Sequence, residues 1–129
     1  MFVLRLIPGM NPAVLRLLLH EYDALVIESF GVGGLPCYEQ KDFLEAVNAW
    51  STAGKPIVIT TQVPHEGSDI AVYQVGARAA NLPGVLQAHT MTVESVVTKL
   101  MWILPQTSDL ERIAQLFYTP VAHDLLTFE

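Results

Sequence analysis

Two uninterrupted apolar runs constrain the fold of this chain more than any other feature. They are residues 24–27 and residues 56–60, and neither contains a charged side chain. A strand with one solvated face alternates apolar and polar residues, whereas a strand covered on both faces reads as a solid apolar run. The two runs therefore predict buried strands of a parallel sheet that has helices on both faces, which is an α/β fold.

Segments with helical apolar spacing alternate with these runs. A first strand at residues 2–7 precedes a helix over 12–20, with Asn11 as its N-cap. The other expected elements are a helix over 40–52 ended by Gly54, a helical piece within 71–80, a weak strand at 84–87, a helix capped by Thr92, and a last helix over 109–116. Ser108 and Glu111 have the spacing of a capping box for that last helix.

Four strands joined by right-handed crossovers predict a small three-layer αβα domain with a parallel sheet. We expect the strand order 2-1-3-4 of Rossmann- and flavodoxin-like sheets, with a switch point between the first and third strands. Ligands of such folds bind outside the carboxyl ends of the strands. Here these ends are Pro8-Gly9, Glu28-Ser29, Thr60-Thr61-Gln62 and residues 87–90.

Length and composition narrow the class of protein. The 129 residues suffice for one domain, and we expect residues 1–129 to form it. A net charge of −6 excludes nucleic-acid binding as the main function, and the lone Cys37 forms no disulfide framework. The chain has neither a membrane-spanning apolar stretch nor a signal peptide at its start, so we expect a cytoplasmic protein that does not bind membranes.

The proportion of charged residues is low. It is 16%, against about 25% in an average soluble domain. In addition, Trp102 and Ile103 fall off the apolar stripe of the helix after Thr92. Both observations favour a surface that is normally covered by another domain or by a second copy, although a merely hydrophobic small domain is the alternative.

No motif for a cofactor, a metal or a complete catalytic group is found. The loop Gly31-Val32-Gly33-Gly34 follows a strand, but Pro36 occupies the third glycine position of a dinucleotide fingerprint, and the loop has no phosphate-binding lysine. The four histidines have no ligand spacing. The residues therefore indicate a binding half-site without its own nucleophile and base.

Polar residues at the strand ends are the candidates for that half-site. Glu28 ends a buried strand, so its carboxylate either points into a polar crevice or binds nearby loop amides. Thr60 and Thr61 offer hydroxyl groups at the end of the third strand, although β-propensity explains two threonines there equally well.

Four blocks of sequence, in this order, resemble one protein family. They are Pro8-Gly9-Met10, residues 26–33, Gly54-Lys55-Pro56 with Thr60-Thr61-Gln62, and residues 91–94 with residues 98–102. The set resembles the C-terminal domain of type I, cytosolic bacterial L-asparaginases of the asparaginase/glutaminase family. A related amidotransferase subunit that acts on mischarged glutamyl-tRNA shares this domain.

The resemblance implies an amidohydrolase whose reactive group lies outside this chain. The family hydrolyses L-asparagine to L-aspartate and ammonia, and its nucleophilic Thr and its Thr-Asp-Lys group belong to a larger N-terminal domain, which we expect to be absent here. We therefore assign no catalytic residue, cofactor or metal to residues 1–129, and expect the isolated chain to be inactive. The implied partners are that N-terminal domain, further subunits in a dimer or tetramer, and a small amino-acid ligand.

The family's site residues carry over position by position. Ser29, Gly31 and Gly33 match the glycine loop after the second strand, and Thr61 and Gln62 match residues that line the interface crevice. Among further positions, Asp69 is a candidate for a polar contact across the dimer.

Four positions depart from the family pattern. One is Thr90, which stands where an Asp is common just before the Met-Thr pair. Gly34 stands where many members have an Asn that reaches the neighbouring subunit's ligand, so that contact is lost. Glu28 and Val63 replace an Arg and a Cys of the asparagine effector site in some type I enzymes, which argues against allosteric asparagine binding.

Two other functions remain open. One is a subunit of the glutamyl-tRNA(Gln) amidotransferase, which would carry an extra N-terminal module. The other is a free-standing binding or regulatory domain that senses an amino acid at the strand ends.

Overall fold

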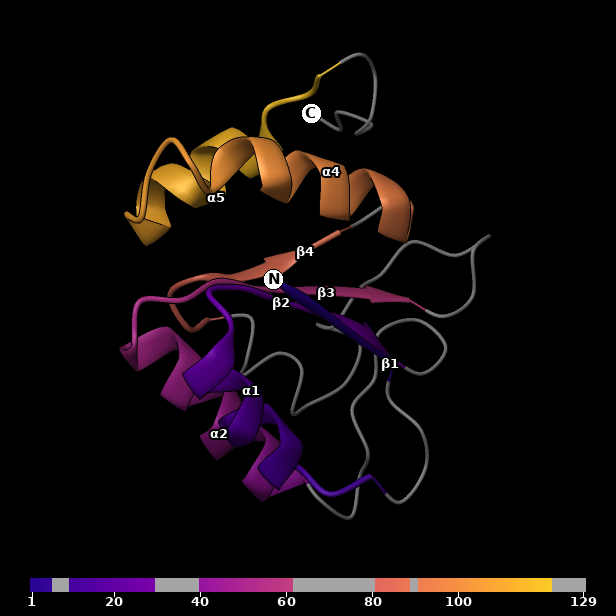
Figure 1. Cartoon of the computed structure of the whole chain (residues 1–129), viewed down its shortest axis with the longest axis vertical. Coiled ribbons are helices and arrows are strands. Elements are labelled where there is room, and N and C mark those ends of the chain that lie inside the picture. The colour runs from indigo at the N-terminus through magenta and orange to yellow at the C-terminus, as the bar shows by residue number, and fades with distance from the viewer. Residues whose placement is uncertain (6–9, 30–39, 62–80, 89–90, 122–129) are drawn as a thin grey trace.

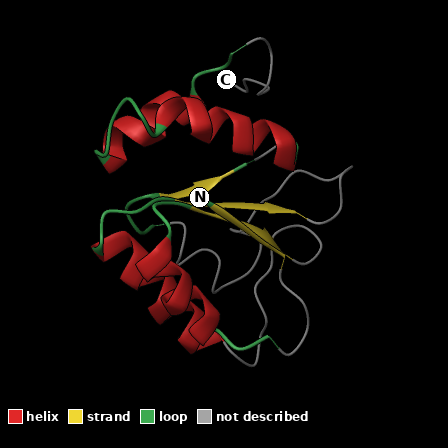
Figure 2. Cartoon of the chain, viewed as in Figure 1, coloured by secondary structure: helices red, strands yellow, loops and turns green. Residues whose placement is uncertain are grey.

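A four-stranded parallel sheet with helices on both faces forms the domain (Figures 1 and 2). The computed structural model describes residues 1–5, 10–29, 40–61, 81–88 and 91–121, with backbone only for residues 29, 40, 41 and 61. The elements along the chain are β1 (Phe2–Arg5), α1 (Ala13–Glu21), β2 (Leu25–Ser29), α2 (Gln40–Thr52), β3 (Ile57–Thr61), β4 (Val85–Gln87), α4 (Val93–Ile103) and α5 (Leu110–Tyr118). The expected α/β class and the parallel sheet are confirmed, whereas the helical piece expected within 71–80 lies outside the described residues.

The strand order is β1-β2-β3-β4, so the expected order 2-1-3-4 is wrong. Each described strand pairs with the next one along the chain, in the same direction, and the order never reverses. The expected switch point therefore does not exist, because β2 lies between β1 and β3. Right-handed crossovers that advance in one direction place their helices on one face, and α1 and α2 indeed share a face, opposite α4 and α5 (Figure 1).

The two central strands bury both of their faces, as the apolar runs predict. Alternate residues point into two separate cores, because successive side chains of a strand lie on opposite faces. Leu25, Ile27, Ile57 and Ile59 pack under α1 and α2, whereas Val26 and Val58 pack under α4 and α5. The sheet is thus packed between two helical layers, with one apolar core on each of its faces.

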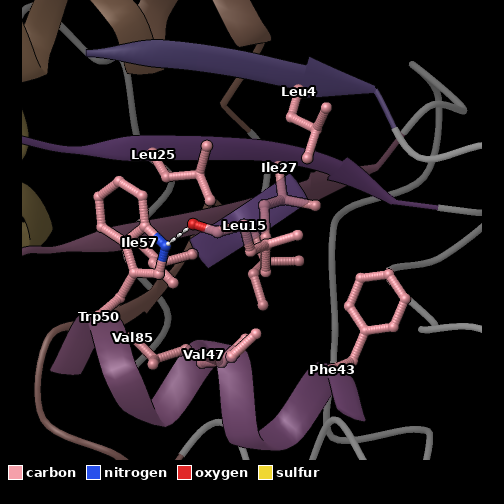
Figure 3. Packing of buried hydrophobic residues seen from close by; sticks show 11 residues of the cluster. Leu4, Leu15, Leu25, Ile27, Phe43, Val47, Trp50, Ile57 and Val85 are labelled. Atoms are coloured by element: carbon pink, nitrogen blue, oxygen red, sulfur yellow. Dashed lines mark hydrogen bonds between the residues drawn. The ribbon is translucent and has the colours of Figure 1, made fainter. Parts of the chain in front are cut away.

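A buried hydrogen bond links the two helices of the first layer (Figure 3). Trp50 of α2 is fully buried, and its Nε1 donates to the carbonyl oxygen of Leu15 in α1 at 2.8 Å. Lys55, just after α2, adds a second link: its ammonium donates to the carbonyl oxygens of Leu19 (2.7 Å) and Tyr22 (3.0 Å) at the end of α1. Cations at that end also interact favourably with the helix dipole.

The helix ends confirm some of the sequence signals and correct others. The Thr92 hydroxyl oxygen accepts from the Ser95 N–H, as expected of the N-cap of α4. The expected Asn11 N-cap is wrong, because α1 begins at Ala13 and its N-cap is Pro12; the Asn11 side chain accepts from the Ala13 N–H just before the first turn. The expected capping box is wrong, because Asp109 rather than Ser108 is the N-cap of α5 and accepts from the Glu111 N–H. Asp and Ser are both good N-caps, so their sequence does not distinguish them.

Two glycines adopt a left-handed conformation. Gly54 ends α2 with φ +74°, and the N–H groups of Gly54 and Lys55 donate back to Ser51 and Trp50 in a Schellman motif. Gly84 precedes β4 with φ +81°, and a Cβ built there would lie 2.9 Å from Leu110 Cδ2 of α5. The close approach joins the turn before β4 to the second apolar layer.

The Trp50–Leu15 hydrogen bond gives a first test. We expect Trp50→Phe to lower the free energy of unfolding by about 2–3 kcal/mol, because it removes a buried donor and leaves a small cavity. Urea denaturation measures the change. Trp102→Phe is the matched control, since Trp102 is 51% exposed, and a loss as large as that of Trp50→Phe would contradict the assigned role.

The two glycines give a second test. Gly54→Ala should lower the free energy of unfolding by about 1–2 kcal/mol, which is the cost of a left-handed backbone for a residue with a Cβ. No steric cost is added, because nothing lies within 4 Å of that Cβ. Gly84→Ala should be about 1 kcal/mol more destabilising because of Leu110. In a double-mutant cycle by urea denaturation, Leu110→Ala should abolish this difference, and an unchanged difference would refute the steric explanation.

Candidate functional site

The carboxyl ends of the four strands lie along one edge of the sheet, where the sequence predicts a site. The arrowheads of the strands in Figure 1 point to the same side of the molecule. The parallel register aligns Arg5 of β1 with Glu28 of β2, and Glu28 with Thr60 of β3. A row of one cation, one carboxylate and one hydroxyl therefore crosses three neighbouring strands.

Glu28 forms the centre of this row. Its side chain is 12% exposed, and its Oε2 accepts from Arg5 Nε at 2.8 Å. The Arg5 side chain is 67% exposed, so solvent screens the pair and its contribution to stability is modest, at most about 1 kcal/mol. The pair nevertheless fixes a carboxylate at the sheet edge without burying an uncompensated charge.

The threonines continue the row. Thr60 is buried, with 2% of its surface exposed. Ser29 and Thr61 are register partners at the ends of β2 and β3, and only their backbones are described. The structure thus brings together four of the predicted site residues: Glu28, Ser29, Thr60 and Thr61.

The remaining predicted site residues lie outside the described part of the chain. They are Gly31, Gly33, Gly34, Gln62 and Asp69. Their roles stay predictions.

Sequence reasoning missed two residues at this edge. Arg5, the cation of the ion pair, is the last described residue of β1, and a charge inside the first apolar run was the available signal. Tyr118, at the end of α5, accepts from the backbone N–H of Gln87 in β4 at 2.9 Å. That N–H belongs to the last strand of the described sheet, and no sequence pattern relates it to a residue 31 positions later.

The environment of Tyr118 shifts its titration. Burial raises the pKa of the phenol, because the charged phenolate loses hydration. The Gln87 N–H opposes this rise, since it donates to the same oxygen and stabilises the phenolate. The net direction is upward, so the hydroxyl stays protonated at neutral pH.

The described residues contain neither a cluster of metal ligands nor a membrane-spanning helix. No three His, Cys, Asp or Glu side chains gather closely enough there to hold a metal ion. Within the same part of the chain, no helix has the length and apolar character that a membrane crossing requires.

The comparison with known families identifies the class of this domain. Residues 1–117 match the glutaminase/asparaginase C-terminal domain. The chain belongs to that family, as the sequence blocks at the strand ends suggest.

Individual relatives carry two different names. An L-asparaginase of Thermococcus kodakarensis is 41% identical over 95% of this chain, and 36% of that protein is covered. A glutamyl-tRNA(Gln) amidotransferase subunit of Metallosphaera sedula is 33% identical over 92% of this chain, which covers 26% of that relative. The chain therefore spans about a quarter to a third of the length of these relatives.

Solved structures of L-asparaginases share the fold. The Thermococcus kodakarensis enzyme superimposes with a TM-score of 0.87 at 40% identity, over 98% of this chain and 38% of that one. L-asparaginase I of Vibrio cholerae O1 gives a TM-score of 0.84 at 25% identity, over 97% of this chain and 37% of that one.

The Tyr118 phenol predicts a pH dependence of stability. Because its pKa is raised in the folded state, its contribution to folding is complete below about pH 10 and is lost as the pH rises through the folded-state pKa. We therefore expect the free energy of unfolding to vary differently with pH in the Tyr118→Phe variant and in the unchanged chain. Above about pH 10 the unchanged chain should lose stability relative to the variant, because its unfolded state then releases a proton that the folded state retains, which favours unfolding.

Urea denaturation of both proteins between about pH 8 and pH 11 measures this difference, and the comparison cancels all other titrating groups. At about pH 8, Tyr118→Phe should lose about 0.5–1.5 kcal/mol, because the Gln87 N–H loses its acceptor. That relative loss should shrink once the pH exceeds the unfolded-state pKa, since ionisation of the unfolded phenol favours unfolding of the unchanged chain alone. Parallel pH profiles for the two proteins would disprove the raised pKa.

Proposed function

We propose that this chain is the C-terminal domain of an L-asparaginase, which hydrolyses L-asparagine to L-aspartate and ammonia. The observation that carries the proposal is the family match over residues 1–117, together with 41% identity to an L-asparaginase over nearly the whole chain. The reaction proceeds through an acyl-enzyme on a Thr of a larger N-terminal domain. Residues 1–129 supply substrate-binding and interface contacts and are inactive alone.

The sheet edge is the part of this domain that meets the substrate. Glu28 presents a carboxylate that Arg5 orients through one oxygen, Oε2. A carboxylate offers about four acceptor positions, so Glu28 can also accept from the α-ammonium group of an amino acid. In this proposal the neighbouring Ser29, Thr60 and Thr61, with Gly31, Gly33, Gly34, Gln62 and Asp69 from the adjoining loops, complete that half of the pocket.

The proposal includes the partners and the place of action. The relatives are longer than this chain, which supports a neighbouring N-terminal domain within a dimer or tetramer. Similarity to an L-asparaginase I supports the cytoplasmic type I class, although the archaeal enzyme has the higher identity to this chain.

The amidotransferase is the second candidate. The Metallosphaera sedula relative is 33% identical to this chain, and it is longer than the asparaginase, because the chain covers 26% of it rather than 36%. An extra N-terminal module upstream of this sequence would favour this candidate, whereas a single larger α/β domain would favour the asparaginase.

A chimera tests the proposed function. This chain would replace the matching segment of the Thermococcus kodakarensis L-asparaginase, which is 41% identical to it. We expect the chimera to release ammonia from L-asparagine, and the isolated 129-residue chain to be slower by a factor on the order of 10³ or more, because it lacks the nucleophile. A coupled ammonia assay measures both.

Three results would contradict the proposal. The first is turnover by the isolated chain that Thr60→Val abolishes, since the reactive hydroxyl would then lie within this chain. The second is a folded chimera without activity on asparagine. The third is tight binding of asparagine by the isolated chain in calorimetry, which would favour a free-standing amino-acid sensor.

A further inference from the structure

The outer surface of α4 carries exposed apolar side chains that the proposed chemistry does not use. Met101 is 62% exposed and Trp102 is 51% exposed, and Val121, shortly after α5, is 46% exposed. We call Met101, Trp102 and Val121 the α4 surface. Of the six large apolar side chains that are exposed among the described residues, four lie between positions 101 and 121. The exposed apolar area is therefore concentrated on one side of the sheet.

In the opposite helical layer, α2 has the polar exterior of a solvated face, and α1 exposes one large apolar side chain, Leu17. The described exposed side chains of α2 are all polar: Asp42, Glu45, Asn48 and Thr52. Glu45 also lies 4.0 Å from the guanidinium of Arg16 in α1. By contrast, Glu94 is the one exposed charged residue of α4. A helix that faces water usually has charged residues on its outer side, and α4 does not follow this pattern.

The α4 surface includes a preformed hollow. Ser95, Thr98, Lys99, Trp102 and Val121 line a space of about 250 Å³. Lys99, one of these lining residues, is 5% exposed, and its ammonium donates to the carbonyl oxygen of Thr119 at 2.7 Å. This bond ties the segment after α5 to α4.

The Lys99 ammonium also lies 5.8 Å from the centre of the Phe117 ring, within the range of a cation–π contact. The hydrogen bond to Thr119 and the contact with Phe117 together hold the segment that leads to Val121, one of the residues that line the hollow. The hollow is therefore already formed before a partner binds.

Trp102 supplies a donor as well as an apolar surface. Its indole N–H makes no hydrogen bond to any residue that the structure describes, while the ring lines the hollow. Trp and Met are enriched at protein interfaces, and a central Trp is a frequent hot spot of binding energy. The chemistry of this surface fits a protein partner that inserts an apolar side chain and offers a carbonyl oxygen to the indole.

We propose that the α4 surface docks the larger, preceding domain of the asparaginase chain. This inference rests on the proposed function, and the lengths of the relatives support it, because the matched segment is 36% of the Thermococcus kodakarensis protein. Three exposed side chains make a small surface. A separate second copy needs roughly 1,200–2,000 Å² of buried area, whereas a domain on the same chain is held at a high effective concentration and needs less.

Footprinting of the asparaginase chimera tests the docking surface. Hydroxyl radicals modify exposed side chains, and mass spectrometry locates the products in the isolated chain and in the chimera. We expect Met101 and Trp102 to be modified at least about five-fold less in the chimera, because an interface excludes water from its centre. Leu17 of α1, which is 68% exposed, is the internal control and should be modified equally in both.

A matched pair of variants gives a second readout. Trp102→Glu should lower the thermal midpoint of the chimera and split its unfolding into two transitions, because a charge prevents docking. Leu17→Glu places the same charge on the opposite layer and should leave one transition. In the isolated chain, neither variant should change the midpoint.

The outcomes separate the docking surface from the proposed function. An active chimera in which Met101 and Trp102 are modified as in the isolated chain overturns the docking inference. An inactive chimera in which both are protected supports docking and overturns the function. A dimer of the isolated chain in sedimentation that Trp102→Glu dissociates would make a second copy the occupant, and would also overturn the inference.

Discussion

Burial of both faces of β2 and β3 is the constraint on which the rest of this structure depends. Leu25 and Ile27 face one helical layer while Val26 faces the other, so neither layer can be removed without exposing a central strand. The parallel direction of the strands agrees with this burial: the crossover helices α1 and α2 cover one face, and α4 and α5, which follow β4, cover the other. It also follows that all carboxyl ends meet at one edge, which is where polar residues such as Glu28 can reach solvent.

The sequence was sufficient to predict the elements and the layers, but not the strand order. The helix over 40–52 was predicted at its observed bounds, because its apolar stripe and Gly54 mark both face and end. The predicted strand order was wrong, because an apolar run does not indicate which strands lie beside it in the sheet. One sequence signal did point to the order: the first strand contains the charged Arg5, as an edge strand does, whereas residues 24–27 contain no polar side chain.

The candidate site was predictable only where it depends on the backbone. Parallel strands align their ends, so Glu28, Ser29, Thr60 and Thr61 could be grouped from the sequence alone. The partner of Glu28 could not, because the pairing with Arg5 depends on β1 lying next to β2. In the same way, the contact between Tyr118 and Gln87 depends on how α5 packs over the edge of β4. Tertiary packing, rather than local pattern, determines these contacts.

The low proportion of charged residues affects one surface of the domain more than the others. The outer side of α2 presents Asp42, Glu45 and Asn48 to solvent in the usual way, and Leu17 of α1 is the one large apolar side chain exposed among the described residues of that layer. The deficit lies on α4, where Met101 and Trp102 occupy positions that charged residues fill on a solvated helix. The same helix buries Val96, Leu100 and Ile103 against the sheet, so it is apolar on two sides. A helix that is apolar on two sides packs between two layers, and the sheet of this domain supplies only one of them.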